Sequence, residues 1–250
     1  MLVPFVLLGA CIKYVPVTPA FQLPKHQYRI NAIGEFETRT QEGAEPDDAF
    51  SVSLNWEVDL EPVEQLRDDS SWLRLTVRTA VYELNDHPLS SRAEGKVIDF
   101  RIFPWGELLS VRYMDHLSGD GRWLDVFEPI IPSLFPNLPD LKKGESKQQE
   151  LRWPIVEGET TLVRGANRIT LQRLPDEGAL RVFRYDGIWL SNERGPLAMQ
   201  EGKVQGQVWL AEGEPWVVRH QFTWSRQILN TDSHQEQSQT FKGEVWRISP

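Results

Sequence analysis

Cysteine is nearly absent from this sequence, since Cys11 is the only one among 250 residues. One cysteine excludes an intramolecular disulfide and any metal site built on paired thiolates. The apolar stretch 1–10 is far shorter than the roughly 20 residues of a transmembrane helix. Basic residues are also scarce, because 27 Lys and Arg face 36 Asp and Glu and leave a formal net charge of −9. Such a chain repels phosphate backbones, so nucleic acid is not an expected partner.

Recognised catalytic and cofactor motifs are absent as well. The sequence has no phosphate-binding glycine loop and no dinucleotide fingerprint. Its histidines are scattered, with no pair at the spacing of metal ligands: His26, His87, His116, His220 and His234. We therefore expect a non-enzymatic protein with no cofactor and no metal.

The segment 113–121 carries the richest chemistry of any predicted loop. Asp115, His116 and Ser118 are the residue types of a nucleophilic triad, but a triad needs its members held by separate scaffold elements. Asp115 and Asp120 lack the regular oxygen spacing of a calcium loop. We interpret the segment as a solvated turn. His220 lies between Arg219 and Gln221 in a predicted strand, and we expect its side chain to face solvent.

Alternating hydrophobicity is the dominant pattern from residue 26 onward. In 50–60 every second residue is apolar, and 73–82 repeats this pattern over most of its length. The alternation is typical of antiparallel strands with one buried face. We predict further strands in the second half at 168–174, 179–185, 204–210, 216–224 and 239–248. With 40% hydrophobic residues and 250 positions, the chain is long enough for one large all-β domain.

Glycine-containing dipeptides punctuate this pattern. Glycine tolerates the backbone angles of tight turns, so we predict turns at Glu42-Gly43, Glu94-Gly95, Trp105-Gly106, Glu177-Gly178, Asp186-Gly187, Glu201-Gly202 and Glu212-Gly213. The segment 61–66 is predicted to form one short helical turn after a strand.

A central segment interrupts the β pattern. Between 124 and 135, apolar residues recur at the three-and-four spacing of a helix face, while Pro129 and Pro132 limit any helix to a short one. We therefore predict a short helical segment near 124–135. It divides a single domain, 26–250, into two similar β halves near 25–118 and 147–250.

The N-terminus explains the single cysteine. Leu8-Gly9-Ala10-Cys11 resembles the lipobox of bacterial lipoproteins, in which small residues precede a cysteine that receives lipid. The resemblance implies a signal peptide at 1–10, palmitate and other acyl chains on Cys11, and a basic start lying upstream. The Pro-containing stretch 11–25 then acts as a spacer. The alternative is a buried N-terminal strand with an ordinary core cysteine.

A second resemblance concerns the domain. The stretch 135–139, Phe-Pro-Asn-Leu-Pro, followed by Lys143-Gly144 and a new strand, is similar to poorly characterised lipoproteins related to the lipoprotein-carrier superfamily. That superfamily implies an antiparallel sheet curled into a half-barrel, with an apolar cavity under short helices. A β-sandwich is the alternative.

These expectations combine into one hypothesis. The chain is an envelope lipoprotein in the outer membrane facing the periplasm, anchored through Cys11 and lacking an acidic retention residue at Ile12. It binds a hydrophobic ligand or another envelope protein. The expected ligand-binding residues gather around the central segment: Trp105, Trp123, Phe127, Ile130, Ile131, Leu134 and Phe135. The same residues would instead fill the core of a sandwich. A structural or interaction lipoprotein without a small ligand, and an envelope hydrolase, are the alternative functions.

Overall fold

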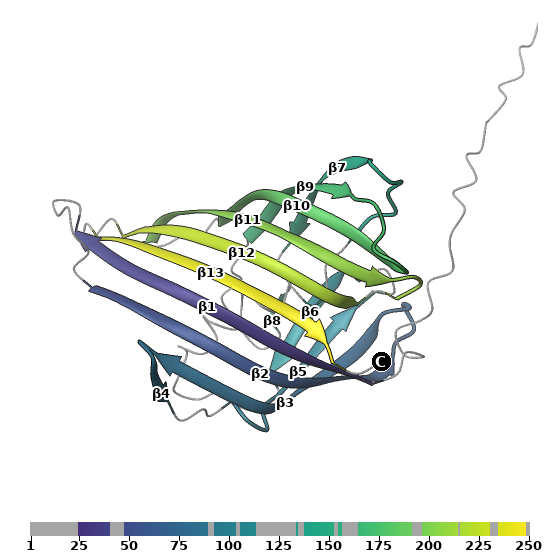
Figure 1. Cartoon of the computed structure of the whole chain (residues 1–250), viewed down its shortest axis with the longest axis horizontal. Coiled ribbons are helices and arrows are strands. Elements are labelled where there is room, and N and C mark those ends of the chain that lie inside the picture. The colour runs from purple at the N-terminus through teal and green to yellow at the C-terminus, as the bar shows by residue number, and fades with distance from the viewer. Residues whose placement is uncertain are drawn as a thin grey trace, which may run out of the picture.

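The protein is built from one large antiparallel sheet (Figure 1). The computed structural model describes residues 25–40, 48–89, 93–103, 106–113, 134, 138–152, 155–156, 165–191, 197–214, 216–230 and 235–248. The strands are His26–Thr40 (β1), Asp48–Gln65 (β2), Ser71–Leu84 (β3), His87–Leu89 (β4), Val97–Ile102 (β5), Leu108–Tyr113 (β6), Ser146–Arg152 (β7), Ile155–Val156 (β8), Gly165–Arg173 (β9), Leu180–Ser191 (β10), Leu197–Ala211 (β11), Val217–Asn230 (β12) and Gln235–Arg247 (β13).

The strand order is β7-β9-β10-β11-β12-β13-β1-β2-β3-β5-β6-β8, with β4 paired to β3 off this path. Every pairing is antiparallel except the short parallel contact between β6 and β8. The strands on either side of the central segment meet where β1 pairs with β13, from Tyr28 opposite Arg247 to Thr40 opposite Gln235. The predicted antiparallel all-β fold is therefore confirmed.

The sheet curls around its apolar face, so that β5, β6 and β8 lie behind β13, β1 and β2 in Figure 1. Its two end strands, β7 and β8, are consecutive in the chain. Arg152 ends β7 and Ile155 begins β8, so about 11 Å of chain at most separates them. The half-barrel expected from the sequence, rather than the sandwich, describes this open but strongly curled sheet.

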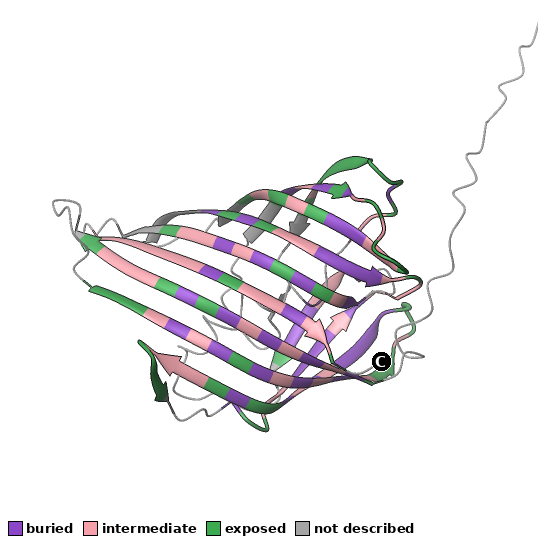
Figure 2. Ribbon diagram, in the orientation of Figure 1, coloured by how far each residue is buried: buried purple, intermediate pink, exposed green. Residues whose placement is uncertain are grey.

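The core lies on one face of the sheet. In β2 the residues at even positions from Val52 to Leu60 are buried, and the residues between them are more exposed. This is the alternation that the sequence predicted, and Figure 2 shows it as bands across the strands. Apolar side chains from both sides of the β1–β13 pairing join in one cluster, including the fully buried Trp56, Phe100 and Trp216.

Two local predictions were wrong. The segment 61–66 is not a helical turn, because β2 continues through Gln65. Pro62 is accommodated at a register shift between β2 and β3, the kind of irregularity where a sheet tolerates proline. The dipeptides at Gly187 and Gly202 are not turns either, because they lie inside β10 and β11. By contrast, Gly95, Gly178 and Gly213 have φ of +77°, +62° and +76° and form the predicted turns.

Several predictions lie outside the described residues. These are the leader with Cys11, the loop 114–121, and the helical segment near 124–135 apart from Leu134, which is buried. Within the described part of the chain, no helix is long and apolar enough to cross a membrane.

Candidate functional site

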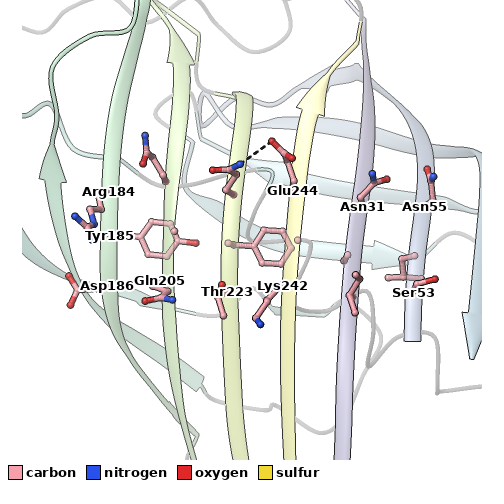
Figure 3. A pocket seen from close by; sticks show the side chains of 18 of the residues that line it. Asn31, Ser53, Asn55, Arg184, Tyr185, Asp186, Gln205, Thr223, Lys242 and Glu244 are labelled. Carbon is pink, nitrogen blue, oxygen red and sulfur yellow. Dashed lines mark hydrogen bonds between the residues drawn. The ribbon is translucent and has the colours of Figure 1, made fainter. Parts of the chain in front are cut away.

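A polar groove runs across nine strands of the sheet, on the face opposite the core. Its volume is about 1470 Å³. Two transverse rows of side chains line it (Figure 3), and the register places neighbours of each row directly opposite one another. From β7 to β3 the first row is Ser146, Gln172, Arg184, Gln207, Gln221, Glu244, Asn31, Asn55 and Val81. From β9 to β3 the second row is Thr170, Asp186, Gln205, Thr223, Lys242, Ile33, Ser53 and Glu83.

The twist of the sheet accounts for the place of this groove. A twisted sheet that curls around a core is convex across its strands and concave along them, like the waist of a hyperboloid. The two rows lie on either side of one line of core-facing residues, which forms the floor: Leu54, Ala32, Gly243, Phe222, Gly206 and Tyr185. We therefore interpret the groove as the waist of the curled sheet.

Glycines leave room for aromatic rings and neighbouring backbone at this level of the sheet. A Cβ on Gly206 would lie 2.5 Å from the Tyr185 hydroxyl and 2.5 Å from the Gln221 carbonyl oxygen, and one on Gly243 would lie 2.4 Å from the Phe222 ring. These rings lie across the glycine of the neighbouring strand, so a side chain there has no room.

The wrongly predicted turn at Gly187 has the same explanation. A Cβ on Gly187 would lie 2.2 Å from the Arg168 carbonyl oxygen and within 2.9 Å of the Ile169 side chain. Glycine in a strand often marks such a close approach of backbones. This residue therefore serves packing against β9 rather than chain reversal.

Tyr185 of the groove floor pairs with a buried histidine, His220. The Tyr185 hydroxyl is 2.8 Å from Nε2 of His220, and the His220 ring lies 5.5 Å from the ring of Phe222. His220 is only 2% exposed, so the prediction that it faces solvent was wrong. It shares the core-facing side of β12 with Phe222, whereas its polar neighbours face outward. Burial raises the pKa of Tyr185, which keeps this phenol protonated.

The groove carries little net charge. Its acids are Glu83, Asp186 and Glu244, and its bases are Arg184 and Lys242. Two of the acids are engaged by neighbours. The Ser53 hydroxyl donates to Glu83 over 2.9 Å, while Glu244 binds Arg219 at 2.5 Å and accepts a hydrogen bond from Gln221 at 3.3 Å. Amide and hydroxyl groups make up most of the remaining lining.

An alternating ladder of arginine and tryptophan flanks the first row. In register order it runs Glu57, Arg29, Trp246, Arg219 and Trp209. Arg29 binds Glu57 at 2.5 Å and lies 5.9 Å from the centre of the Trp246 ring. Arg219 lies 5.0 Å from the ring of Trp209. These cation–π contacts and ion pairs hold the arginine and tryptophan side chains in place along one side of the groove.

Comparison with known proteins identifies no family. No family model and no curated protein matches the chain. Among solved structures it is similar to mutant forms of the porin of Rh. blastica. One is 5% identical with a TM-score of 0.27, and another is 8% identical with a TM-score of 0.28. Each alignment covers 90% of this chain and 100% of the porin. A likeness at this level carries no inference about function.

The groove residues were not among the sequence predictions. Of the expected ligand-binding residues, Leu134 is buried in the core cluster, and the others lie outside the described residues: Trp105, Trp123, Phe127, Ile130, Ile131 and Phe135. A signal for the groove was nevertheless present. The outward positions of β1, β2, β11 and β12 near the middle of the sheet carry Asn, Gln, Ser and Thr rather than charged residues: Asn31, Ser53, Asn55, Gln205, Gln207, Gln221 and Thr223.

Proposed function

We propose that this chain is a lipid-anchored, non-enzymatic binding protein of the bacterial envelope, and that the transverse groove is its ligand surface. The observation that carries the proposal is the arrangement of the groove. Nine strands present two aligned rows of mainly hydrogen-bonding side chains on the face that the core does not use. Side chains on strands are held more precisely than side chains on loops, which suits a surface that recognises its ligand by many polar contacts.

The side chains of the two rows favour a polar ligand over a hydrophobic one, while the floor between the rows is mainly apolar. Among the groove residues of the two rows, only Ile33 and Val81 are apolar, and they are 57% and 53% exposed. A hydrophobic ligand needs a mainly apolar pocket. The hydrophobic-ligand hypothesis depends instead on the central aromatic residues around 105–135, and the groove gives no support to it.

The lipid anchor is supported by the sequence of 8–11. A spacer of 13 residues separates Cys11 from Lys25, and a proline-rich spacer of this length reaches about 40 Å. It leads into the start of β1, next to the end of β13. We expect Cys11→Ala, expressed with the native upstream region, to lose both a palmitate-analogue label and membrane association. Retention of both would refute the anchor and leave the groove proposal to its own test.

The groove is tested with envelope extracts. Gln205 and Gln207 of β11 supply one side chain to each row, whereas Gln227 of β12 faces outward beyond the groove. We expect an envelope fraction to raise the melting temperature of the purified full chain in detergent. The shift should be lost in Gln205→Ala/Gln207→Ala and kept in Gln227→Ala. If no fraction gives a shift that depends on the groove, the proposed function is wrong.

A further inference from the structure

We infer that the ligand of the groove is a linear, uncharged polysaccharide lying across the strands. This inference rests on the proposed function, because it names the class of ligand that the same groove holds. Four features of the groove support it. Three are properties of the two rows: the chemistry of their side chains, their charge and their repeat distance. The fourth is the arginine–tryptophan ladder beside the first row.

Side-chain chemistry is the first property. Six of the groove residues are amides: Asn31, Asn55, Gln172, Gln205, Gln207 and Gln221. Another four are serine or threonine, which carry hydroxyls: Ser53, Ser146, Thr170 and Thr223. An amide side chain both donates and accepts hydrogen bonds, and so does a hydroxyl. Sugar hydroxyls also do both, so a surface of amides and hydroxyls meets them whichever way each sugar unit presents its groups. An acyl chain would leave these groups without partners.

Charge is the second property. Three acidic and two basic residues line the groove, and the whole chain carries a net charge of −9. A polyanion, such as a nucleic acid or a phosphate-containing polymer, is bound by concentrated basic side chains. Here Arg184 and Lys242 stand on different strands in different rows. An uncharged polymer avoids the repulsion that the chain exerts on anions.

Repeat distance is the third property. Each strand from β9 to β3 contributes a pair of side chains, one to each row, while β7 contributes only Ser146; adjacent strands lie about 4.8 Å apart. A sugar unit of a linear polysaccharide is about as long as this spacing. Successive sugars can therefore meet equivalent pairs of side chains, and the span of nine strands, about 38 Å, accommodates about eight sugars. An extended peptide advances only about 3.3 Å per residue and falls out of step with the strands.

The arginine–tryptophan ladder beside the first row is the fourth feature. Trp246 is part of the arginine–tryptophan ladder and lies one row outward from Glu244 on β13. Its side chain is half-buried, and Arg29 holds it from the side of β1. An indole offers a flat apolar body beside a polar groove. The apolar C–H face of a sugar ring pairs with such a surface while its hydroxyls reach the amides.

The experiment measures binding of cello- and chito-oligosaccharides, from disaccharide to hexasaccharide, to the full chain in detergent by titration calorimetry. We expect affinity for one series to increase with each added sugar up to the hexamer. Gln205→Ala/Gln207→Ala should weaken binding of the hexamer about tenfold, since two hydrogen bonds are lost. Gln227→Ala should bind it as the wild type does. Circular dichroism melting curves identify any variant that fails to fold.

The outcomes separate this inference from the proposed function. If neither oligosaccharide series binds, or if binding does not depend on length and on Gln205 and Gln207, the polysaccharide class is refuted. If a protein fraction of the envelope, or phospholipid vesicles, shifts the melting temperature in a groove-dependent way while the oligosaccharides do not, the groove still binds a ligand but the class is wrong. If no fraction gives a groove-dependent shift, both proposals fail.

Discussion

Replacing Gly206 by alanine should destabilise the protein strongly. The added methyl group would lie 2.5 Å from the Gln221 carbonyl oxygen and 2.5 Å from the Tyr185 hydroxyl, whereas ordinary contacts are about 3.5–4 Å. The carbonyl belongs to the neighbouring strand and moves only with it. The ring can move, but its hydroxyl is 2.8 Å from His220, so moving it breaks a partly buried hydrogen bond.

The magnitude follows from these contacts. Overpacking of a filled core costs about 1–3 kcal/mol, and loss of the hydrogen bond to His220 costs about 0.5–1.5 kcal/mol. In the opposite direction, replacing a strand glycine by alanine stabilises the folded state by about 0.5–1 kcal/mol. We therefore expect Gly206→Ala to lower the free energy of unfolding by about 2 kcal/mol, measured by urea denaturation followed by tryptophan fluorescence.

Two further variants separate the causes. In Gly34→Ala the three nearest atoms all belong to the Phe241 side chain, so the added methyl group displaces neither backbone nor a hydrogen bond, and the cost should be smaller, about 1 kcal/mol. In a Tyr185→Phe background the hydrogen bond is already lost, and Gly206→Ala should then cost about 1 kcal/mol less than in the wild type. The reasoning is refuted if Gly206→Ala is as stable as the wild type, or if Gly34→Ala costs as much.

Two other substitutions probe single polar contacts. Tyr28→Phe removes a buried hydrogen bond of 2.8 Å to the Val217 carbonyl oxygen and should lower the free energy of unfolding by about 1–2 kcal/mol; an unchanged urea midpoint would contradict this. Asp176 lies between Lys143 and Arg173, and hydrogen bonds from these residues lower the pKa of its carboxyl below 3.8. The ionised Asp176 carboxylate therefore stabilises the folded protein fully above pH 3.8. This stabilisation is lost as the pH falls through the lower pKa of the folded state. The difference in urea midpoint between wild type and Asp176→Asn should shrink as the pH falls below 3.8, and a difference that stays constant as the solution is acidified would argue against the ion pairs.

Local sequence pattern was sufficient for the fold class and much of the core. The alternation from Val52 to Leu60 identified a strand and its buried face, because both depend only on the period of the β-strand. The same rule failed to place His220, because its neighbours Arg219 and Gln221 are polar and a buried polar residue does not stand out. Its burial depends on Tyr185, a partner two strands away.

Glycine shows why the groove could not be predicted from the sequence. In the sequence, a glycine that forms a turn cannot be distinguished from a glycine that leaves room for a neighbouring strand. Gly178 does the first and Gly187 does the second. The register across β9 to β13 decides between them, and register is a long-range property. The groove depends on that register in nine strands at once, so no single segment specifies it.

Because β1 pairs with β13, the middle of the sheet cannot form until the last strand of the chain is present. Until β13 is present, β1 and β12 are both unpaired edges in the middle of the sheet, and long unpaired edges promote association with other chains. Contacts between segments so distant in the chain also form slowly. During synthesis, β1 is made first and β13 last. The edges of β1 and β12 therefore stay exposed to other molecules until β13 has been made. We expect a truncation before residue 235 to aggregate rather than to fold into a smaller sheet.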